Sequence, residues 1–137
     1  MDETDQKIIE ILKKDARTSF VDIGKEIGLS EAAVRRRVQN LIAQNTIRKF
    51  TIEVDGGQGA SAITLITASP QVPTQKMTEM LRKMKGVDVV YEITGQYDIA
   101  VVLSAPTIAE INACIDDVRR IEGVANTNTL IILRTLR

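Results

Sequence analysis

The sequence predicts an α+β fold in two units, with three helices in the first and alternating strands and helices in the second. Apolar residues recur at helical spacing through residues 4–44, whereas short β-type apolar runs and two helical patterns alternate after residue 60. A glycine-rich stretch, residues 56–60, separates the two patterns and is typical of a hinge. We therefore expect domains at residues 1–55 and 61–137, which a chain of 137 residues accommodates.

Composition excludes several classes of function. The sequence has no histidine and one cysteine, Cys114, so an internal disulfide, a histidine-based triad and an imidazole or zinc site are excluded. The longest unbroken apolar run, residues 99–103, is far shorter than the roughly 18 residues that a membrane span needs. The N-terminus is acidic and has no apolar segment, so we expect no secretory signal. These features predict a cytoplasmic protein without metal, cofactor or membrane partner, and we do not expect an enzyme.

Basic residues are concentrated in one segment, although 18 Lys and Arg balance 18 Asp and Glu in the whole chain. Residues 13–49 hold nine basic and four acidic side chains, a net charge of +5. A locally basic segment in a neutral protein favours contact with nucleic acid. A charge run alone is as often a solvated helical face, so a motif must decide between the two.

Two short helical patterns and a glycine turn begin the first unit. Residues 4–14 carry an apolar face, and Asp2 or Thr4 can cap that helix. Ser19 is the expected cap of a second helix, which Gly28 would end in a left-handed conformation before a third helix. A short turn with glycine between two helices is the signature of a helix-turn-helix.

The third expected helix, residues 31–44 with Ser30 as its cap, has two distinct faces at about 100° per residue. Its buried stripe is expected to comprise Val34, Val38, Leu41 and Ile42. Its opposite face holds Ala32, Arg36, Gln39 and Ala43, flanked by Arg35 and Arg37. Small residues beside Arg and Gln suit close approach to base edges, because Arg reads guanine and Gln reads adenine in the major groove. The alternative is an ordinary amphipathic helix with solvated arginines; the coincidence of turn, cap and triple arginine favours DNA recognition.

A wing is expected after this helix. Asn45 can end the helix in a left-handed conformation, and residues 46–54 then alternate as a strand. The strand would place Arg48 and Lys49 near a phosphate backbone. The expected DNA-binding residues of this winged helix-turn-helix are Ser30, Ala32, Arg35, Arg36, Arg37, Gln39, Arg48 and Lys49.

The second unit is expected to have the order strand, helix, strand, strand, helix, strand, which is the ferredoxin-like βαββαβ arrangement. The expected strands are residues 62–69, 87–94, 99–105 and 129–133. The expected helices are residues 74–85, with Met77, Met80, Leu81 and Met84 on one face, and 107–121, with Ile108, Ile111, Ile115 and Val118.

Both faces of this sheet are expected to be largely apolar. In residues 99–103 apolar side chains occupy both alternating sets of positions, and the strands at 87–94 and 129–133 do the same. Two helices need only one apolar face, so the other face implies a second layer supplied by another copy of the chain. We therefore expect a homo-oligomer and not a monomer.

Several of these features resemble the Lrp/AsnC (feast/famine) family of transcriptional regulators. The residues that resemble its N-terminal domain are Asp2, Asp5, Asp15-Ala16-Arg17, Ile23, Ile27-Gly28-Leu29-Ser30, Val34, Arg37-Val38 and Leu41. Those that resemble its RAM effector-binding domain are Gly86-Val87, Thr94-Gly95-Gln96-Tyr97-Asp98, Gly123-Val124, Thr127 and Thr129. One departure is Asn45-Thr46-Ile47, where the family usually has a glycine shortly before the wing isoleucine.

The resemblance implies a small effector, usually an amino acid, bound between RAM domains of neighbouring dimers, and dimers that associate into octamers. Carried onto this chain, the expected effector-binding residues are Thr94, Gly95, Gln96, Tyr97, Asp98, Thr127 and Thr129. Asp98 could pair with a basic side chain, which favours lysine or arginine, or with the α-ammonium, which leaves polar neutral amino acids such as glutamine open. The alternative is that Asp98 only stabilises the hairpin.

These observations predict a DNA-binding transcriptional regulator whose assembly or operator affinity responds to an amino acid. One alternative is a winged-helix regulator of a different metabolite, which a ligand screen would distinguish. The other is a ferredoxin-like small-molecule binding module or enzyme without DNA function, which has to leave the helix-turn-helix unexplained. The expected partners are double-stranded DNA, other copies of the chain and the amino-acid ligand.

Overall fold

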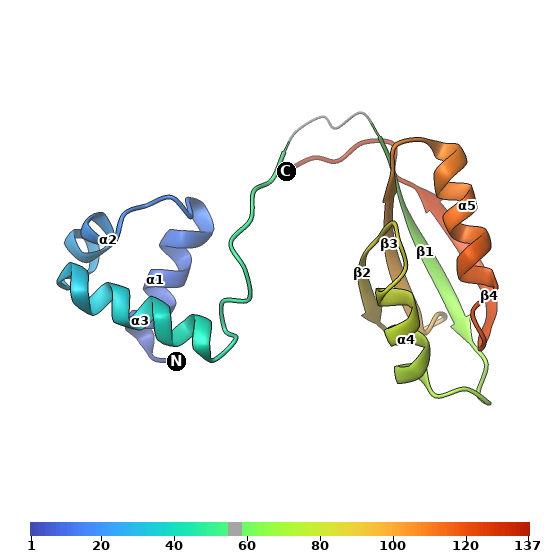
Figure 1. Ribbon diagram of the computed structural model, residues 1–137, viewed down its shortest axis with the longest axis horizontal. Helices are drawn as coiled ribbons and strands as arrows, with labels where there is room; N and C mark the ends of the chain where they lie inside the picture. The colour runs from blue at the N-terminus through green and yellow to red at the C-terminus, as the bar shows by residue number, and fades with distance from the viewer. Residues whose placement is uncertain (55–58) are drawn as a thin grey trace. The chain divides into compact units, whose positions relative to one another are not determined.

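The computed structural model describes residues 1–54 and 59–137 (Figure 1). The chain divides into a helical unit, Met1–Asp55, and a unit that contains a sheet, Gly56–Arg137. Most of the hinge expected at residues 56–60 lies outside the described residues, although Ala60 already belongs to the first strand.

The helical unit consists of α1 (Glu3–Lys14), α2 (Phe20–Ile27) and α3 (Glu31–Ala43). Each helix begins after a residue whose side chain accepts a hydrogen bond from the backbone N–H three residues later, which satisfies a donor that the helix leaves free. These caps are Asp2, Ser19 and Ser30. All three helices therefore begin where local chemistry predicts.

The left-handed residues expected at two helix ends are also confirmed. Gly28 has a φ of 78° after α2, and Asn45 has a φ of 58° after α3. The turn at Asn45 lets the backbone N–H groups of Thr46 and Ile47 both donate to the carbonyl oxygen of Leu41, at 2.9 and 3.0 Å. Asparagine thus provides here the conformation for which glycine is usual.

The core of the helical unit is small and lies where the three helices meet. Its buried members are Ile8, Leu12, Ile23, Val34 and Val38. The expectation that Ile42 joins the buried stripe of α3 was wrong, because its side chain is 44% exposed. Ile42 lies at the margin of the stripe, and the core that α1 and α2 form with α3 does not extend far enough to cover it.

The expected wing strand at residues 46–54 was wrong. The described part of the first unit contains no strand, and residues 48–54 form neither helix nor strand. Ile47 packs against the helical core, whereas Phe50, Ile52 and Val54 are 52%, 81% and 70% exposed. An alternating pattern specifies the extended conformation, but a strand also needs a neighbouring strand to pair with.

The second unit has the expected βαββαβ order. Its elements are β1 (Ala60–Ala68), α4 (Thr74–Arg82), β2 (Val87–Glu92), β3 (Ile99–Ala105), α5 (Ile108–Arg119) and β4 (Val124–Ile131). The four strands form one antiparallel sheet in the order β2-β3-β1-β4. This order confirms the ferredoxin-like topology.

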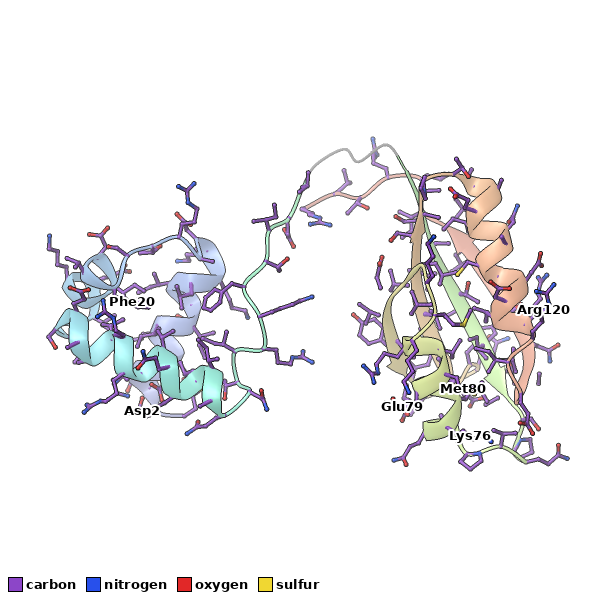
Figure 2. The ribbon with its side chains drawn as sticks, in the orientation of Figure 1. Asp2, Phe20, Lys76, Glu79, Met80 and Arg120 are labelled. Carbon is purple, nitrogen blue, oxygen red and sulfur yellow. The ribbon has the colours of Figure 1, made fainter. Side chains whose placement is uncertain are left out.

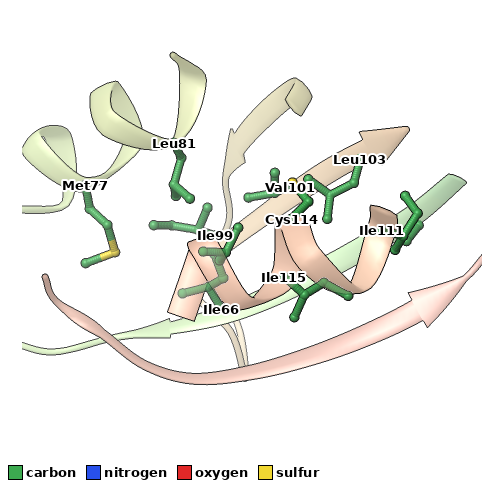
Figure 3. Packing of buried hydrophobic residues seen from close by; sticks show 11 residues of the cluster. Ile66, Met77, Leu81, Ile99, Val101, Leu103, Ile111, Cys114 and Ile115 are labelled. Atoms are coloured by element: carbon green, nitrogen blue, oxygen red, sulfur yellow. The ribbon is translucent and has the colours of Figure 1, made fainter. Parts of the chain in front are cut away.

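Helices α4 and α5 cover one face of the sheet (Figure 3). Met77 and Leu81 of α4 and Ile111 and Ile115 of α5 pack against alternate residues of the strands, which include Ile66, Ile99, Val101 and Leu103. Met80, expected on the same face of α4, and Ile108, expected on the apolar face of α5, are 44% and 55% exposed, so both expectations were wrong. Helix α4 also ends at Arg82, before the expected residue 85, because Met84 and Gly86 already form the turn into β2.

Strand β4 begins earlier than its apolar pattern predicts. It starts at Val124 and not at Thr129, and its first part pairs with β1 through polar residues such as Asn126 and Asn128. As an edge strand it needs little apolar surface, so hydrophobic alternation does not reveal its start.

Among the described residues of this unit, no helix packs on the opposite face of the sheet. Pairing in the ladders places one alternating set of side chains on this open face, which comprises Ile63, Leu65, Val89, Tyr91, Ala100, Val102 and Leu130. Val89, Tyr91 and Leu130 are 40%, 53% and 49% exposed. The open face is therefore a contiguous apolar surface on the single chain.

Candidate nucleic-acid interface and effector site

A tight turn joins α2 to α3. The backbone N–H groups of Gly28 and Leu29 both donate to the carbonyl oxygen of Gly24, at 2.8 and 2.9 Å. A Cβ atom on Gly24 would lie 2.3 Å from the carbonyl oxygen of Leu29, so no larger residue fits without movement of the turn. Gly24 was not singled out in the sequence; its only local signal is a glycine inside a helical pattern. This close approach sets how α3 leaves α2.

The outward face of α3 carries the residues expected to read bases. Val34, Val38 and Leu41 are 0%, 2% and 2% exposed and define the buried side of the helix. Arg36 and Gln39 lie on the opposite side and are exposed, together with the small residues Ala32 and Ala43. Arg36 forms no ion pair with any residue that the structure describes. The helix therefore presents a free guanidinium and an amide between two alanines.

Arg35 occupies the flank of α3 that faces α2. Its guanidinium pairs with Glu31 one turn earlier and lies over the ring of Phe20, 5.8 Å from the centroid. Phe20 and Asp2 lie on either side of α3 (Figure 2). These contacts hold Arg35 beside the base-reading face and leave about half of its side chain exposed.

Arg37, also expected to contact DNA, occupies the other flank, where its partners are carboxylates of α1. Its Nη1 donates to Asp2 Oδ2 at 2.8 Å and to Asp5 Oδ1 at 3.0 Å. The hydrogen bond from Arg37 is the main cause that lowers the pKa of Asp2 below its ordinary value. The same pairs raise the pKa of Arg37. The structure thus places Arg37 in an ion-pair cluster with α1, on the side of α3 away from Gln39.

A hollow of about 480 Å³ runs along this flank of α3. Its wall includes Arg36, Asn40 and Gln44, which lie one turn apart along the helix, and Asp5 and Met1 of the N-terminus. Asn40 and Gln44 were not among the expected site residues. The spacing of four residues from Arg36 is the signal that could have identified them.

Arg48 and Lys49, expected to contact phosphate from a wing strand, lie in residues 48–54, which form no strand. Arg48 and Lys49 are both exposed. Lys49 borders a hollow of about 540 Å³, which is also lined by Lys13, Lys14 and Arg17 from the end of α1. Four basic side chains therefore surround one hollow, although 32 residues of sequence separate Arg17 from Lys49.

The loop expected to form one wall of the effector site closes the hairpin between β2 and β3. Asp98 Oδ2 accepts a hydrogen bond of 2.7 Å from the backbone N–H of Ala68, and the N–H of Asp98 donates to Ile66. Gly95 has a φ of 119°, which few other residues tolerate. The carboxylate of Asp98 therefore has a structural partner, and only one of its two oxygens is used in this bond.

The two threonines expected opposite this loop lie on the helix-covered side of the sheet. Thr127 Oγ1 accepts a hydrogen bond of 3.1 Å from Arg119 Nε. The Thr129 hydroxyl pairs with that of Thr64, which is fully buried, at 3.1 Å. Thr127 pairs with Ile66 in the ladder, and Ile66 also binds Asp98, so the structure brings the loop and Thr127 to the same end of the sheet.

The hydroxyl of Tyr97 points toward β4, where it lies 3.1 Å from Asn128 Nδ2. Asn128 pairs with Leu65 in the ladder and therefore shares the open face, not the side of Thr127 and Thr129. Thr94, Gly95 and Gln96 are exposed. Arg119 and Asn128 were not among the expected residues, since their positions depend on how α5 and β4 pack.

Comparison with known proteins identifies both units. Residues 1–42 match the AsnC-type helix-turn-helix domain, and residues 61–137 match the Lrp/AsnC ligand binding domain. The HTH-type transcriptional regulator LysM of Saccharolobus solfataricus is 48% identical over 135 residues, which are 98% of this chain and 95% of LysM. This chain belongs to the Lrp/AsnC family of transcriptional regulators.

Solved structures of such regulators share the fold of this one. The structure of E. coli AsnC, 24% identical, superimposes with a TM-score of 0.80 and covers 98% of this chain and 93% of AsnC. The transcriptional regulator NMB0573 from Neisseria meningitidis, solved as a complex with L-Met, is 18% identical, has a TM-score of 0.83 and covers 100% of this chain and 92% of NMB0573.

As an Lrp/AsnC regulator the chain is not an enzyme, and its first unit is a DNA-binding helix-turn-helix. The alternative of a binding module without DNA function is thereby set aside. Within residues 1–54 and 59–137, no helix of this regulator is long and apolar enough to cross a membrane. In the same described portion, His, Cys, Asp and Glu side chains form no group of three or more that could hold a metal ion.

Proposed function

We propose that this regulator recognises its operator through the outward face of α3, with Arg36 and Gln39 reading bases and Ala32 allowing close approach. The observation that carries the proposal is that these residues lie exposed, opposite the buried Val34 and Val38. An α-helix with this arrangement fits the major groove; Arg36 can donate two hydrogen bonds to guanine, and Gln39 can donate one to adenine and accept one from it.

Contacts with the phosphate backbone surround this face in the proposal. Ser30 lies at the N-terminus of α3, where free N–H groups and the helix dipole favour an anion. Arg35, Arg48 and Lys49 are exposed cations of the same unit. Such contacts position the protein on the duplex and carry no direct sequence information.

Replacing Arg36 or Gln39 with alanine should relax the preference for one base pair and cost about 1–3 kcal/mol of binding free energy. Arg48→Ala should instead weaken binding to all sequences by similar factors. The measurement is titration of a duplex that the native protein selects from a random pool, and of its single-base-pair variants. Unchanged base preference in both α3 variants would show that another face of the helix reads the DNA.

The regulator is proposed to act as a dimer formed through the open face of the sheet. No helix of the described residues covers the seven apolar side chains on that face, and a surface of this kind favours a second copy. A dimer would present two α3 helices to half-sites about one helical turn apart. The family resemblance further suggests that four dimers associate into an octamer.

The effector is proposed to be an amino acid that binds at the end of the sheet formed by residues 94–98 and Thr127. The unused oxygen of Asp98 can accept from an ammonium group, and the hydroxyl of Thr127 can still donate to a carboxylate. The L-Met complex of a regulator with the same fold supports this ligand class. An effector bound there would change assembly or operator affinity through its different affinity for two states.

Asp98→Asn should abolish the ligand-dependent change in operator affinity or assembly while leaving basal DNA binding nearly intact. Asparagine keeps an oxygen for the N–H of Ala68 but removes the charge that an ammonium needs. A thermal-shift screen against the twenty amino acids first identifies the ligand, and operator titrations with and without it then compare the two proteins. A full response in the variant would reduce Asp98 to a hairpin residue; a response only to other metabolites would favour a regulator of a different ligand class.

A further inference from the structure

One arginine of α3 is tied to the start of α1 by a closed set of hydrogen bonds. Asp2 Oδ1 accepts from the N–H of Asp5 at 2.8 Å, and Asp5 Oδ2 accepts from the N–H of Asp2 at 3.2 Å. The remaining oxygen of each carboxylate accepts from Arg37 Nη1, at 2.8 and 3.0 Å. The two carboxylates of the α1 capping box therefore also accept hydrogen bonds from a single guanidinium nitrogen of Arg37.

This cluster is better shielded than the other ion pairs of the described residues. The side chains of Arg37 and Asp5 are 29% and 16% exposed, whereas that of Asp2 is 57% exposed. In the pairs that do not involve Arg37, every side chain is at least 49% exposed. Isolated exposed pairs contribute little, whereas a network with shielded partners and good geometry holds its members in one arrangement. The hydrogen bond from Arg37 lowers the pKa of Asp2, so this carboxylate keeps its charge to a lower pH than a free aspartate does.

The cluster also holds the Arg37 side chain on the side of α3 away from Gln39. Nη1 has two hydrogens, and each is donated to one of the two carboxylates. At about 100° per residue, Arg37 points roughly 160° away from Gln39 around the helix axis. The carboxylates of Asp2 and Asp5 take both hydrogens of Nη1, so this nitrogen has none left to donate to a DNA phosphate.

We propose that Arg37 is a positioning residue for DNA recognition: Asp2 and Asp5 hold it so that α3 keeps the rotation about its axis that aims Arg36 and Gln39 at the bases. The inference rests on the proposed reading of bases by those two residues. A recognition site tolerates errors of only about 10–20° in the orientation of its side chains. Because Arg36 is the next residue on the same helix, fixing the rotation of α3 at residue 37 also fixes the direction of the Arg36 side chain.

The test compares Arg37→Gln, Arg37→Lys and Asp5→Asn with the native full-length protein. Glu3→Gln is the matched control, because Glu3 is an acid of the same first turn that pairs with Lys7 and not with Arg37. Each protein is titrated with the duplex selected by the native protein and with a random duplex of equal length, at several salt concentrations. Circular dichroism establishes that each variant is folded.

We expect Arg37→Gln and Asp5→Asn to lower the ratio of selected to random affinity by about tenfold, the size of one lost base contact. The slope of log affinity against log salt should stay unchanged, since no phosphate contact is lost. Arg37→Lys, which keeps the charge, should give an intermediate ratio. Glu3→Gln should leave the ratio unchanged.

A direct contact between Arg37 and phosphate gives the opposite results and would overturn the proposal. Arg37→Gln would then reduce the salt slope by about 0.9, and Asp5→Asn would tighten binding to both duplexes because it frees the arginine. Unchanged ratios in folded variants would overturn it as well. If Arg37→Gln does not fold, Asp5→Asn and Arg37→Lys decide by the same ratios. If the native protein itself prefers no duplex, the proposed reading of bases by Arg36 and Gln39 is wrong. That result is distinct from a failure of the proposal for Arg37 alone, in which the native protein keeps its preference.

Discussion

Gly24→Ala should destabilise the helical unit by about 3 kcal/mol and abolish operator binding. The new Cβ atom would lie 2.3 Å from the carbonyl oxygen of Leu29, which is backbone and cannot rotate away. The turn would have to open, and the hydrogen bonds of Gly28 and Leu29 to Gly24 would weaken. A unit of this size has a total stability of only a few kcal/mol, so the loss is a large fraction of it.

The measurements for Gly24→Ala are thermal unfolding followed by circular dichroism and operator titration. Gly28→Asn is the control in the same turn, because a Cβ on Gly28 meets no atom within 4 Å and asparagine tolerates its φ of 78°. We expect that control to cost less than about 1 kcal/mol and to keep DNA binding. Light scattering should show an unchanged assembly for both variants, since the second unit is untouched. Native-like melting of Gly24→Ala would contradict the close packing of this turn.

Val102→Glu should convert the assembly to a monomer of 15.1 kDa and lower operator affinity by about a hundredfold or more. Val102 lies in the middle of the open face, paired with Ile63 on β1 and Val89 on β2. A dimer through that face would bury the carboxylate without a partner, which costs several kcal/mol. A monomer offers one α3 and loses the gain from binding two half-sites together.

Light scattering at micromolar concentration measures the assembly of this variant, and operator titration measures its affinity. Ile108→Glu is the matched control, since Ile108 is a 55% exposed apolar residue on α5, on the other side of the sheet. It should keep both assembly and affinity. A dimer that persists in Val102→Glu would show that copies meet through a different surface.

Local sequence was sufficient wherever a few neighbouring residues determine the structure. The caps Asp2, Ser19 and Ser30 and the left-handed Gly28 and Asn45 all act through hydrogen bonds over three to five residues. The helical spacing of Val34, Val38 and Leu41 likewise predicted which side of α3 is buried. The order of the four strands followed from alternation and short connections.

Expectations failed where a residue's environment depends on a distant part of the chain. Residues 46–54 have the pattern of a strand but no described strand pairs with them, and β4 begins before any apolar signal. Ile42 and Met80 have apolar side chains at the edge of their helical faces, and only the extent of the neighbouring packing decides that they are exposed.

The sequence by itself determined the helix-turn-helix, the ferredoxin-like topology and the exposed face of α3, because capping and periodicity are properties of adjacent residues. Only the tertiary structure decided which partners the arginines of α3 have. The three arginines form one basic run in the sequence. Among the described residues, however, Arg35 pairs with Glu31, Arg36 forms no ion pair, and Arg37 binds carboxylates 32 and 35 positions away. Ion pairs form between groups that folding brings within about 4 Å, and no local pattern encodes that distance for residues so far apart in the chain.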